Sequence, residues 1–138
     1  MDCIFCDIIN GKGEAEILYE NELVTAFLDI RPVNYGHTLV IPKKHFTNFL
    51  ELPDEYAAEL MRVTQLMAGI IQESLKADGF NVIINNGAAA GQTVYHFHFH
   101  IIPRFISDFN YRPRLKAYAD GSMKEFAEII RNAVTNKG

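Results

Sequence analysis

The seven residues from His96 to Ile102 read His-Phe-His-Phe-His-Ile-Ile, and this alternation of polar and apolar side chains constrains the fold most. Successive side chains of a β-strand point to opposite faces of a sheet. A strand over residues 95–102 therefore places the three imidazoles on one face, about 6.6 Å apart, and turns the two phenylalanines into the core. Thr, Lys or Glu would serve a solvated face equally well, so three histidines in this pattern predict a chemical site.

Turn residues and hydrophobic spacing predict the elements around this strand. Further strands are expected at 15–20, 23–28, 37–41 and 80–85, with Pro42 ending the third of these. A long helix is expected to begin at Pro53 and to be ended by Gly79. A capping box at Ser122–Glu125 predicts a C-terminal helix, and residues 4–10 a short helical turn. We therefore expect an α+β fold with a mostly antiparallel five-stranded sheet, one long helix and a C-terminal helix.

Length, charge and composition limit the classes of protein to which the chain can belong. The 138 residues suit a single domain over residues 1–138, and a net charge of −4 argues against a nucleic-acid polymer as partner. A single nucleotide needs only a few local donors and stays possible. We expect no membrane segment, because no stretch approaches the roughly 20 apolar residues of a membrane span. The N-terminal residues lack the features of a signal peptide, so a cytoplasmic location is expected.

The two cysteines, Cys3 and Cys6, form a Cys-x-x-Cys pair at the N-terminus. A thioredoxin-like redox pair should follow a strand and open a helix, and nothing precedes this pair. A metal site needs two more ligands, which the five histidines can supply. The remaining alternative is two small buried side chains in a turn.

Residues 85–93, with the sequence Asn-Asn-Gly-Ala-Ala-Ala-Gly-Gln-Thr, carry small side chains that let backbone N–H groups approach an anion. The loop is neither a P-loop nor Gly-x-Gly-x-x-Gly, but it leads within three residues into His96. That position favours a phosphate site beside a nucleophile over an ordinary hairpin loop. Asp29 follows an apolar strand, where its carboxylate either caps the next turn or accepts the hydroxyls of a ribose.

Several separated blocks together resemble the histidine triad family, in its order and at its spacing. They are His96–Ile102, Leu28–Ile30, Gly36–His45, Asn85 and Gly91–Tyr95, and the resemblance covers roughly residues 3–104. The chain is most similar to the nucleotide-binding branch, and within it to the bacterial zinc-containing members. The resemblance implies that family's fold and a homodimer whose two sheets join edge to edge. The segment after Phe105 matches least, which leaves substrate preference open.

The resemblance also implies roles for individual residues. His98 matches the nucleophile that attacks an α-phosphate, and His100 the residue that hydrogen-bonds phosphoryl oxygens and the leaving group. Asp29 matches the ribose-binding acid, and Ile30 part of the base pocket. The implied nucleotide-binding set is Asp29, Ile30, Asn85, Gly91, Gln92, Thr93, Val94, His98 and His100. The implied ligands of a structural Zn²⁺ are Cys3, Cys6, His45 and His96.

These matches predict a hydrolase or transferase that cleaves purine nucleoside phosphoramidates or related nucleotides at the α-phosphate. The reaction would pass through a nucleotidyl-histidine and release a nucleoside monophosphate, with N–H groups of Gly91–Thr93 and His100 stabilising the phosphoryl oxygens. A dinucleoside polyphosphate hydrolase and a nucleotide-binding protein with incidental turnover are the alternatives. A catalytic metal on two triad histidines is disfavoured, because no carboxylate stands beside the triad in the sequence.

Overall fold

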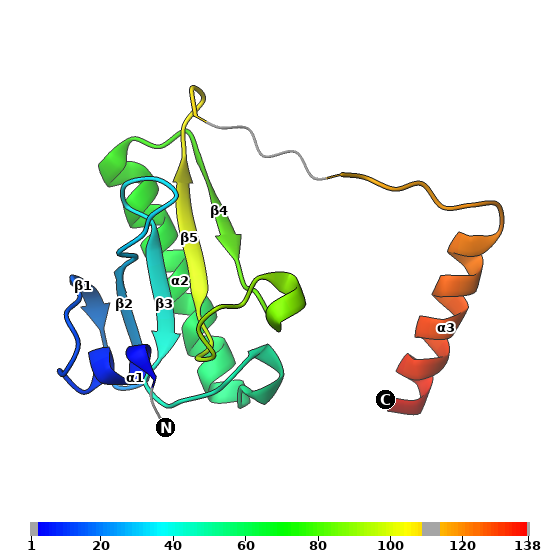
Figure 1. The fold of residues 1–138 in the computed structure, drawn as a ribbon, viewed down its shortest axis with the longest axis horizontal. Coiled ribbons are helices and arrows are strands. Elements are labelled where there is room, and N and C mark those ends of the chain that lie inside the picture. Colours follow the sequence, from blue (N-terminus) through cyan, green and yellow to red (C-terminus); the bar gives the residue numbers. More distant parts are fainter. Residues whose placement is uncertain (1–2, 109–113, 138) are drawn as a thin grey trace. The chain divides into compact units, whose positions relative to one another are not determined.

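The computed structural model describes residues 3–108 and 114–137, and confirms the predicted α+β class (Figure 1). The helices are α1 (Ile4–Ile9), α2 (Asp54–Leu75) and α3 (Ser122–Lys137), with two short 3₁₀ turns, η1 (Phe49–Glu51) and η2 (Ala88–Ala90). The strands are β1 (Ile17–Glu20), β2 (Val24–Leu28), β3 (Thr38–Pro42), β4 (Gly79–Ile83) and β5 (Phe99–Arg104). In the described residues, none of the helices is both long and apolar enough to cross a membrane.

The five strands form one antiparallel sheet in the order β1-β2-β3-β5-β4. The turn between β1 and β2 forms because Asn21 Oδ1 accepts hydrogen bonds from the N–H groups of Leu23 and Val24, at 2.9 and 3.0 Å. Non-consecutive β3 and β5 lie side by side in the centre. The sheet therefore brings the histidine-rich segment next to the strand that follows His37.

Each face of the sheet has its own apolar cluster. On one face α2 packs through Leu60, Val63, Met67 and Ile71 against Val24, Val40, Phe99 and Ile101 of the strands and against Phe97, which precedes β5. On the other face Phe5 of α1 packs with Phe27, Leu39 and Ile41. The alternation along the histidine segment is confirmed, because its phenylalanines enter the α2 cluster while His96 and His98 contact the Phe5 ring of α1.

The strand that carries the histidines is shorter than predicted. It begins at Phe99, so His96 and His98 lie in the preceding extended segment rather than in the ladder. Pairing with β3 stops there because the Phe97 N–H donates instead to the Phe46 carbonyl at 2.7 Å. Pro42, predicted to end the third strand, is itself the last residue of β3 and pairs with Val24.

Two helix boundaries also differ from the sequence predictions. Pro53 is the N-cap of α2 rather than its first residue, and the helix ends at Leu75, before Gly79. Lys76 takes the left-handed conformation that glycine usually supplies, with φ 55°, and Gly79 begins β4. The predicted capping box does not form, because Ser122 is the first residue of α3 and the N–H groups of Ser122 and Glu125 donate to the Ala119 and Gly121 carbonyls, at 3.0 and 3.3 Å.

The chain divides into two compact units, Met1–Asp108 and Phe109–Gly138. The first unit contains the sheet, α1 and α2, and the second contains the predicted C-terminal helix, α3. Apolar side chains of α3 recur at helical spacing as expected, and they are exposed. A single domain over residues 1–138 stays a prediction.

Candidate active site and metal centre

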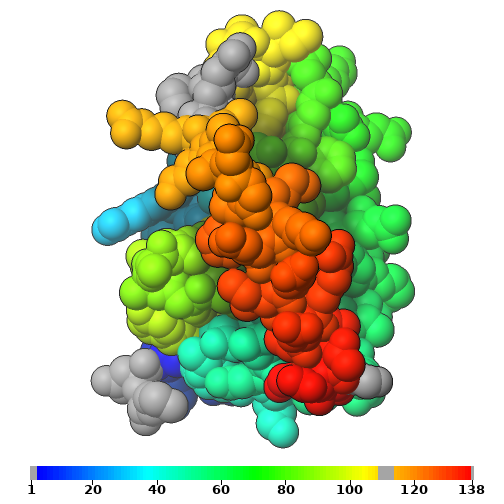
Figure 2. All heavy atoms as spheres, turned by 90° about the vertical axis from the view of Figure 1, so that its right-hand side faces the viewer, coloured from blue at the N-terminus to red at the C-terminus, as the bar shows by residue number. Residues whose placement is uncertain are grey.

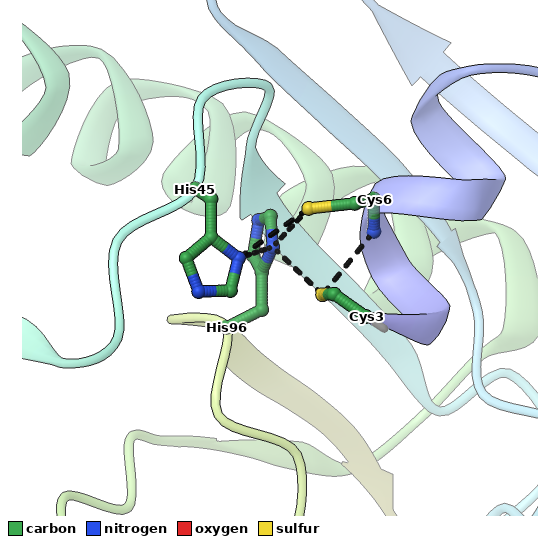
Figure 3. A group of neighbouring side chains, drawn as sticks. All are labelled: Cys3, Cys6, His45 and His96. Carbon is green, nitrogen blue, oxygen red and sulfur yellow. Dashed lines mark hydrogen bonds between the residues drawn. The ribbon is translucent and has the colours of Figure 1, made fainter. Parts of the chain in front are cut away.

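Four side chains from three parts of the first unit converge on one point (Figure 3). Cys3 is the N-cap of α1 and Cys6 lies one turn into it, His45 follows β3, and His96 precedes β5. Their ligand atoms all lie within 4.8 Å of one another. The structure thus brings together the whole metal-ligand set that the family resemblance implies.

The separations of these atoms fit a tetrahedral metal ion. His45 Nδ1 and His96 Nδ1 are 3.1 Å apart, Cys6 Sγ lies 3.3 and 3.5 Å from them, and Cys3 Sγ lies 3.4 Å from His96 Nδ1. Tetrahedral zinc, with bonds of about 2.3 Å to sulfur and 2.0–2.1 Å to nitrogen, requires ligand atoms about 3.3–3.8 Å apart, the two sulfurs having the longest separation. Two thiols and two imidazoles are also the donor chemistry of structural zinc sites. The residues present therefore fit the ion.

The buried His96 ring is held in the orientation that metal binding needs. Its Nε2 lies 2.8 Å from the Pro42 carbonyl, which only accepts, so Nε2 carries the proton. The lone pair of Nδ1 then points at the two cysteines. This backbone contact is the outer partner that metal-bound histidines ordinarily have.

His98 is oriented as a nucleophile. Its Nδ1 lies 2.7 Å from the His96 carbonyl, so Nδ1–H donates and Nε2 keeps its lone pair. The ring is buried, and burial lowers the pKa of His98 below its ordinary value, although the hydrogen bond to the His96 carbonyl opposes this. The Phe5 ring packs edge-on against it, with ring centres 5.1 Å apart. His98 is therefore neutral near pH 7, with one nitrogen available.

His100 meets a residue to which the sequence assigned no role, His37. His37 Nε2 lies 2.9 Å from His100 Nδ1, and the Val33 N–H donates to His37 Nδ1 at 3.0 Å. Because Nδ1 of His37 accepts, its Nε2 carries the proton and donates to His100 Nδ1. His100 then bears its own proton on Nε2. Burial, with the charges of His98 and His37, lowers the pKa of His100 to about 4, so the ring is neutral.

Asp29 completes this group from the end of β2. Its Oδ2 lies 3.5 Å from His37 Nε2, and its Oδ1 accepts from the Arg31 N–H at 2.9 Å. The sequence argument against a catalytic metal was therefore wrong in its premise, because the fold places a carboxylate beside the triad. The hydrogen bonds still disfavour a metal there, since the Val33 N–H occupies Nδ1 of His37 and leaves the proton on Nε2. The contact of His37 with His100, which joins residues far apart in the chain, follows from the sheet order, in which β3 and β5 are neighbours.

Side-chain hydrogen bonds hold the small-residue loop in place, both within the loop and to the segment after β3. Gln92 is buried, and its side-chain nitrogen donates to the Thr47 carbonyl at 2.7 Å while its oxygen accepts from the Gly87 N–H at 2.9 Å. Asn86 Oδ1 accepts from the Phe49 N–H at 2.8 Å. These bonds hold the loop, yellow-green in Figure 2, against the blue-green segment after β3.

The expected phosphate donors of this loop need a correction. The Gly91 N–H donates to the Ala88 carbonyl and the Gln92 N–H to the Gly87 carbonyl, because the loop closes on itself as the η2 turn. Among the hydrogen bonds of the described residues, none uses the N–H of Thr93, which is exposed. Thr93 is thus the member of Gly91–Thr93 that remains a donor.

The other predicted nucleotide-binding residues lie at the two ends of the small-residue loop and in the loop after β2. Val94 packs against the α1 cluster, and Asn85 is half-buried with its Nδ2 beside Gly91. Ile30, next to Asp29, is 91% exposed. The exposed Ile30 side chain leaves apolar surface beside the Asp29 carboxylate.

Comparison with known proteins agrees with this arrangement. A family model described as "HIT domain" matches residues 10–106. The chain is 42% identical over 103 residues to "Adenylylsulfatase HINT3" of Arabidopsis thaliana, covering 75% of this chain and 52% of that protein. It resembles the crystal structure of a histidine triad nucleotide-binding protein from Candida albicans with TM-score 0.88, at 29% identity and covering 99% and 100% of the two chains.

A third comparison bears on the metal centre. The crystal structure of a Zn-bound histidine triad family protein from Mycobacterium smegmatis matches with TM-score 0.74 at 40% identity, covering 99% of this chain and 95% of that one. The family model covers most of the chain, and its range, residues 10–106, includes the five strands and the three triad histidines. The chain belongs to the HIT domain family, the histidine triad family that its sequence resembles.

Proposed function

We propose that the chain is a hydrolase or transferase that cleaves purine nucleoside phosphoramidates or related nucleotides at the α-phosphate. The observation that carries the proposal is the pair His98 and His100, which presents a free nitrogen and an N–H from rings 4.8 Å apart. A nucleophile beside a hydrogen-bond donor is what displacement at phosphorus needs. The Candida relative is named as a nucleotide-binding protein and the Arabidopsis relative as an adenylylsulfatase, and both names support a nucleotide with an α-phosphate as the ligand.

In the proposed reaction, His98 Nε2 attacks the α-phosphorus while the bond to the leaving group breaks. The leaving group departs with the bonding electron pair, receives a hydrogen bond from His100 Nε2–H and takes a proton from solvent. Water then attacks the same phosphorus and gives a proton to solvent as the P–N bond to His98 breaks. The products are the protonated leaving group, a nucleoside monophosphate and the free enzyme. Thr93 and His100 donate to the phosphoryl oxygens.

Zinc is proposed as the resident ion of the cluster formed by Cys3, Cys6, His45 and His96. The Mycobacterium neighbour is Zn-bound, and the donor atoms here have separations close to those of a tetrahedral zinc site. When bound, the ion supplies a closed four-ligand structural centre with no open position for substrate. Its ligands join α1 to the segment that follows β3 and to the segment that precedes β5.

The proposed homodimer has a suitable edge in the first unit. β4 is an outer strand of the sheet, and its Phe80, Val82 and Ile83 are 40%, 43% and 38% exposed. Pairing β4 with the same strand of a second copy would cover this apolar edge. That arrangement agrees with sheets joined edge to edge.

Asp29→Asn should weaken nucleotide binding more than it slows chemistry. The carboxylate can accept both ribose hydroxyls, whereas an amide offers one acceptor, so we expect the Kd for a nucleoside monophosphate to rise about tenfold. Single-turnover rates at saturating substrate should fall less than about threefold, because Asp29 touches no reacting atom. Isothermal titration and single-turnover kinetics measure the two effects. A large fall in rate with unchanged Kd would contradict a ribose-binding role.

The substrate class is tested by parallel assays on one preparation. We expect faster turnover of an adenosine phosphoramidate than of a dinucleoside tetraphosphate or an adenylyl sulfate. Faster turnover of the tetraphosphate would favour a dinucleoside polyphosphate hydrolase. Negligible turnover of all three, with tight nucleotide binding, would favour a binding protein with incidental activity and reject the proposed reaction.

A further inference from the structure

The loop between β2 and β3 carries both Asp29 and His37, and hydrogen bonds within it join its two ends. The Asp29 N–H donates to the His37 carbonyl at 2.8 Å, and the His37 N–H donates to the Asn34 carbonyl at 3.0 Å. The Val33 N–H also binds the His37 ring. Because these residues form one hydrogen-bonded unit, a contact that fixes Asn34 also fixes Asp29 and His37.

Asn34 links this loop to the end of β5. Its side-chain nitrogen donates one hydrogen to the Pro103 carbonyl and the other to Asp108 Oδ2, both at 2.8 Å. Both hydrogens of the amide are therefore used, which fixes its orientation. The two acceptors come from the strand that carries His100 and from the turn directly after it.

Asp108 is itself held rigidly. Arg104 grips its two carboxylate oxygens, with Nη2–Oδ1 at 2.8 Å and Nε–Oδ2 at 3.1 Å, and the Phe105 N–H donates to Oδ2 at 2.9 Å. Arg104 also donates to Asn81 Oδ1 of β4 at 3.0 Å. The Arg104 hydrogen bonds hold the pKa of Asp108 well below its usual range, so the carboxylate stays ionised. Planar two-point contacts of this kind impose geometry as well as attraction.

We propose that Asn34, Asp108 and Arg104 form a clamp that positions Asp29 and His37 relative to β5. Asn34 and Asp108 are then positioning residues for nucleotide binding and for the orientation of His100. The inference rests on the proposed function, because that reaction uses Asp29 to bind ribose and uses His100, which His37 orients. An ordinary surface ion pair such as Arg62–Glu59, at 2.7 Å on α2, has no such connection to the site.

Kinetics and binding test the clamp. Asn34→Ala and Asp108→Ala should each raise the Kd for a nucleoside monophosphate and lower kcat/KM, both about tenfold, since small misplacements of binding groups are costly. The double variant should be no worse than Asn34→Ala alone, because Asn34→Ala already removes the contact between the two residues. Asp78→Asn is the matched control. Asp78 Oδ2 accepts a hydrogen bond at 2.8 Å from the N–H of Ile106, which lies in the same turn as Asp108. Asp78 has no hydrogen bond to Asn34 among the described residues.

The control should keep Kd and kcat/KM within about twofold, even where its Tm falls. Nitrogen NMR of the imidazoles gives a readout that needs no ligand. Asn34→Ala should shift the ring-nitrogen signals of His37 and His100, and Asp78→Asn should not. Unchanged signals and an unchanged Kd in Asn34→Ala would overturn the clamp. If the parent protein binds nucleotide without turnover, the proposed reaction fails, while Kd and NMR still decide the clamp.

Discussion

His98→Ala should lower kcat by at least about four powers of ten while leaving the Kd for a nucleoside monophosphate within about threefold. The buried ring supplies the bare Nε2 that would form the covalent bond, and a methyl group cannot replace it. Asp29 and Ile30, which we assign to ribose and base, lie in the β2–β3 loop and stay in place. Phosphoramidate turnover and isothermal titration measure the two quantities.

Thr25→Val is a suitable control, because Thr25 is buried in β2 with a side-chain oxygen that has no partner. It should keep kcat near that of the parent protein. The covalent route also predicts net retention at phosphorus, since two inversions cancel. A chiral α-thiophosphate substrate hydrolysed in isotopically labelled water reports the outcome. A near-native kcat in His98→Ala, or inversion of configuration at phosphorus in the parent protein, would contradict the assignment of His98 as nucleophile.

The sequence predicted those features that depend on local periodicity. Alternation from His96 to Ile102 placed the imidazoles opposite the phenylalanines, and this holds even though β5 begins only at Phe99. Helical spacing located α2, but the helix ends at Leu75 with Lys76 as its cap, short of the predicted terminator. Local sequence signals predict well which face of a strand or helix a side chain lies on, but they predict poorly where the element begins and ends. Tertiary hydrogen bonds, such as that from the Phe97 N–H to the Phe46 carbonyl, decide where strand pairing stops.

Pairings between distant segments were outside the reach of sequence patterns. The hydrogen bond between His37 and His100 exists because β3 and β5 are neighbours, which the chain order does not state. Gln92 was expected to bind nucleotide, and that role stays a prediction. Its side-chain bonds reach Thr47 and Gly87, so its contribution in the proposed site is to hold the loop. Composition carries no information on such pairings.

Metal binding should give the largest effect on stability. We expect one zinc per chain, and a free-zinc concentration of about 100 times Kd should stabilise the native state by about 2.7 kcal/mol. For a chain of this size that corresponds to a rise in Tm of about 5–15 °C. The reason is that Cys3 and Cys6 of α1 and the separate His45 and His96 form the site only in the folded chain. Elemental analysis and thermal unfolding, with and without chelator, measure both quantities.

Cys3→Ser should abolish stoichiometric binding and most of this rise in Tm. Lys44→Ala is the matched control, because Lys44 precedes His45 but its ammonium lies over the Phe46 ring, outside the cluster. Loss of zinc should also slow turnover, since Phe5, between the two cysteines, contacts the rings of both His96 and His98. A metal-free chain after zinc addition, or Cys3→Ser with full metal content, would reject the site. If a zinc-free chain keeps an unchanged kcat, the ion stabilises the fold and has no effect on turnover.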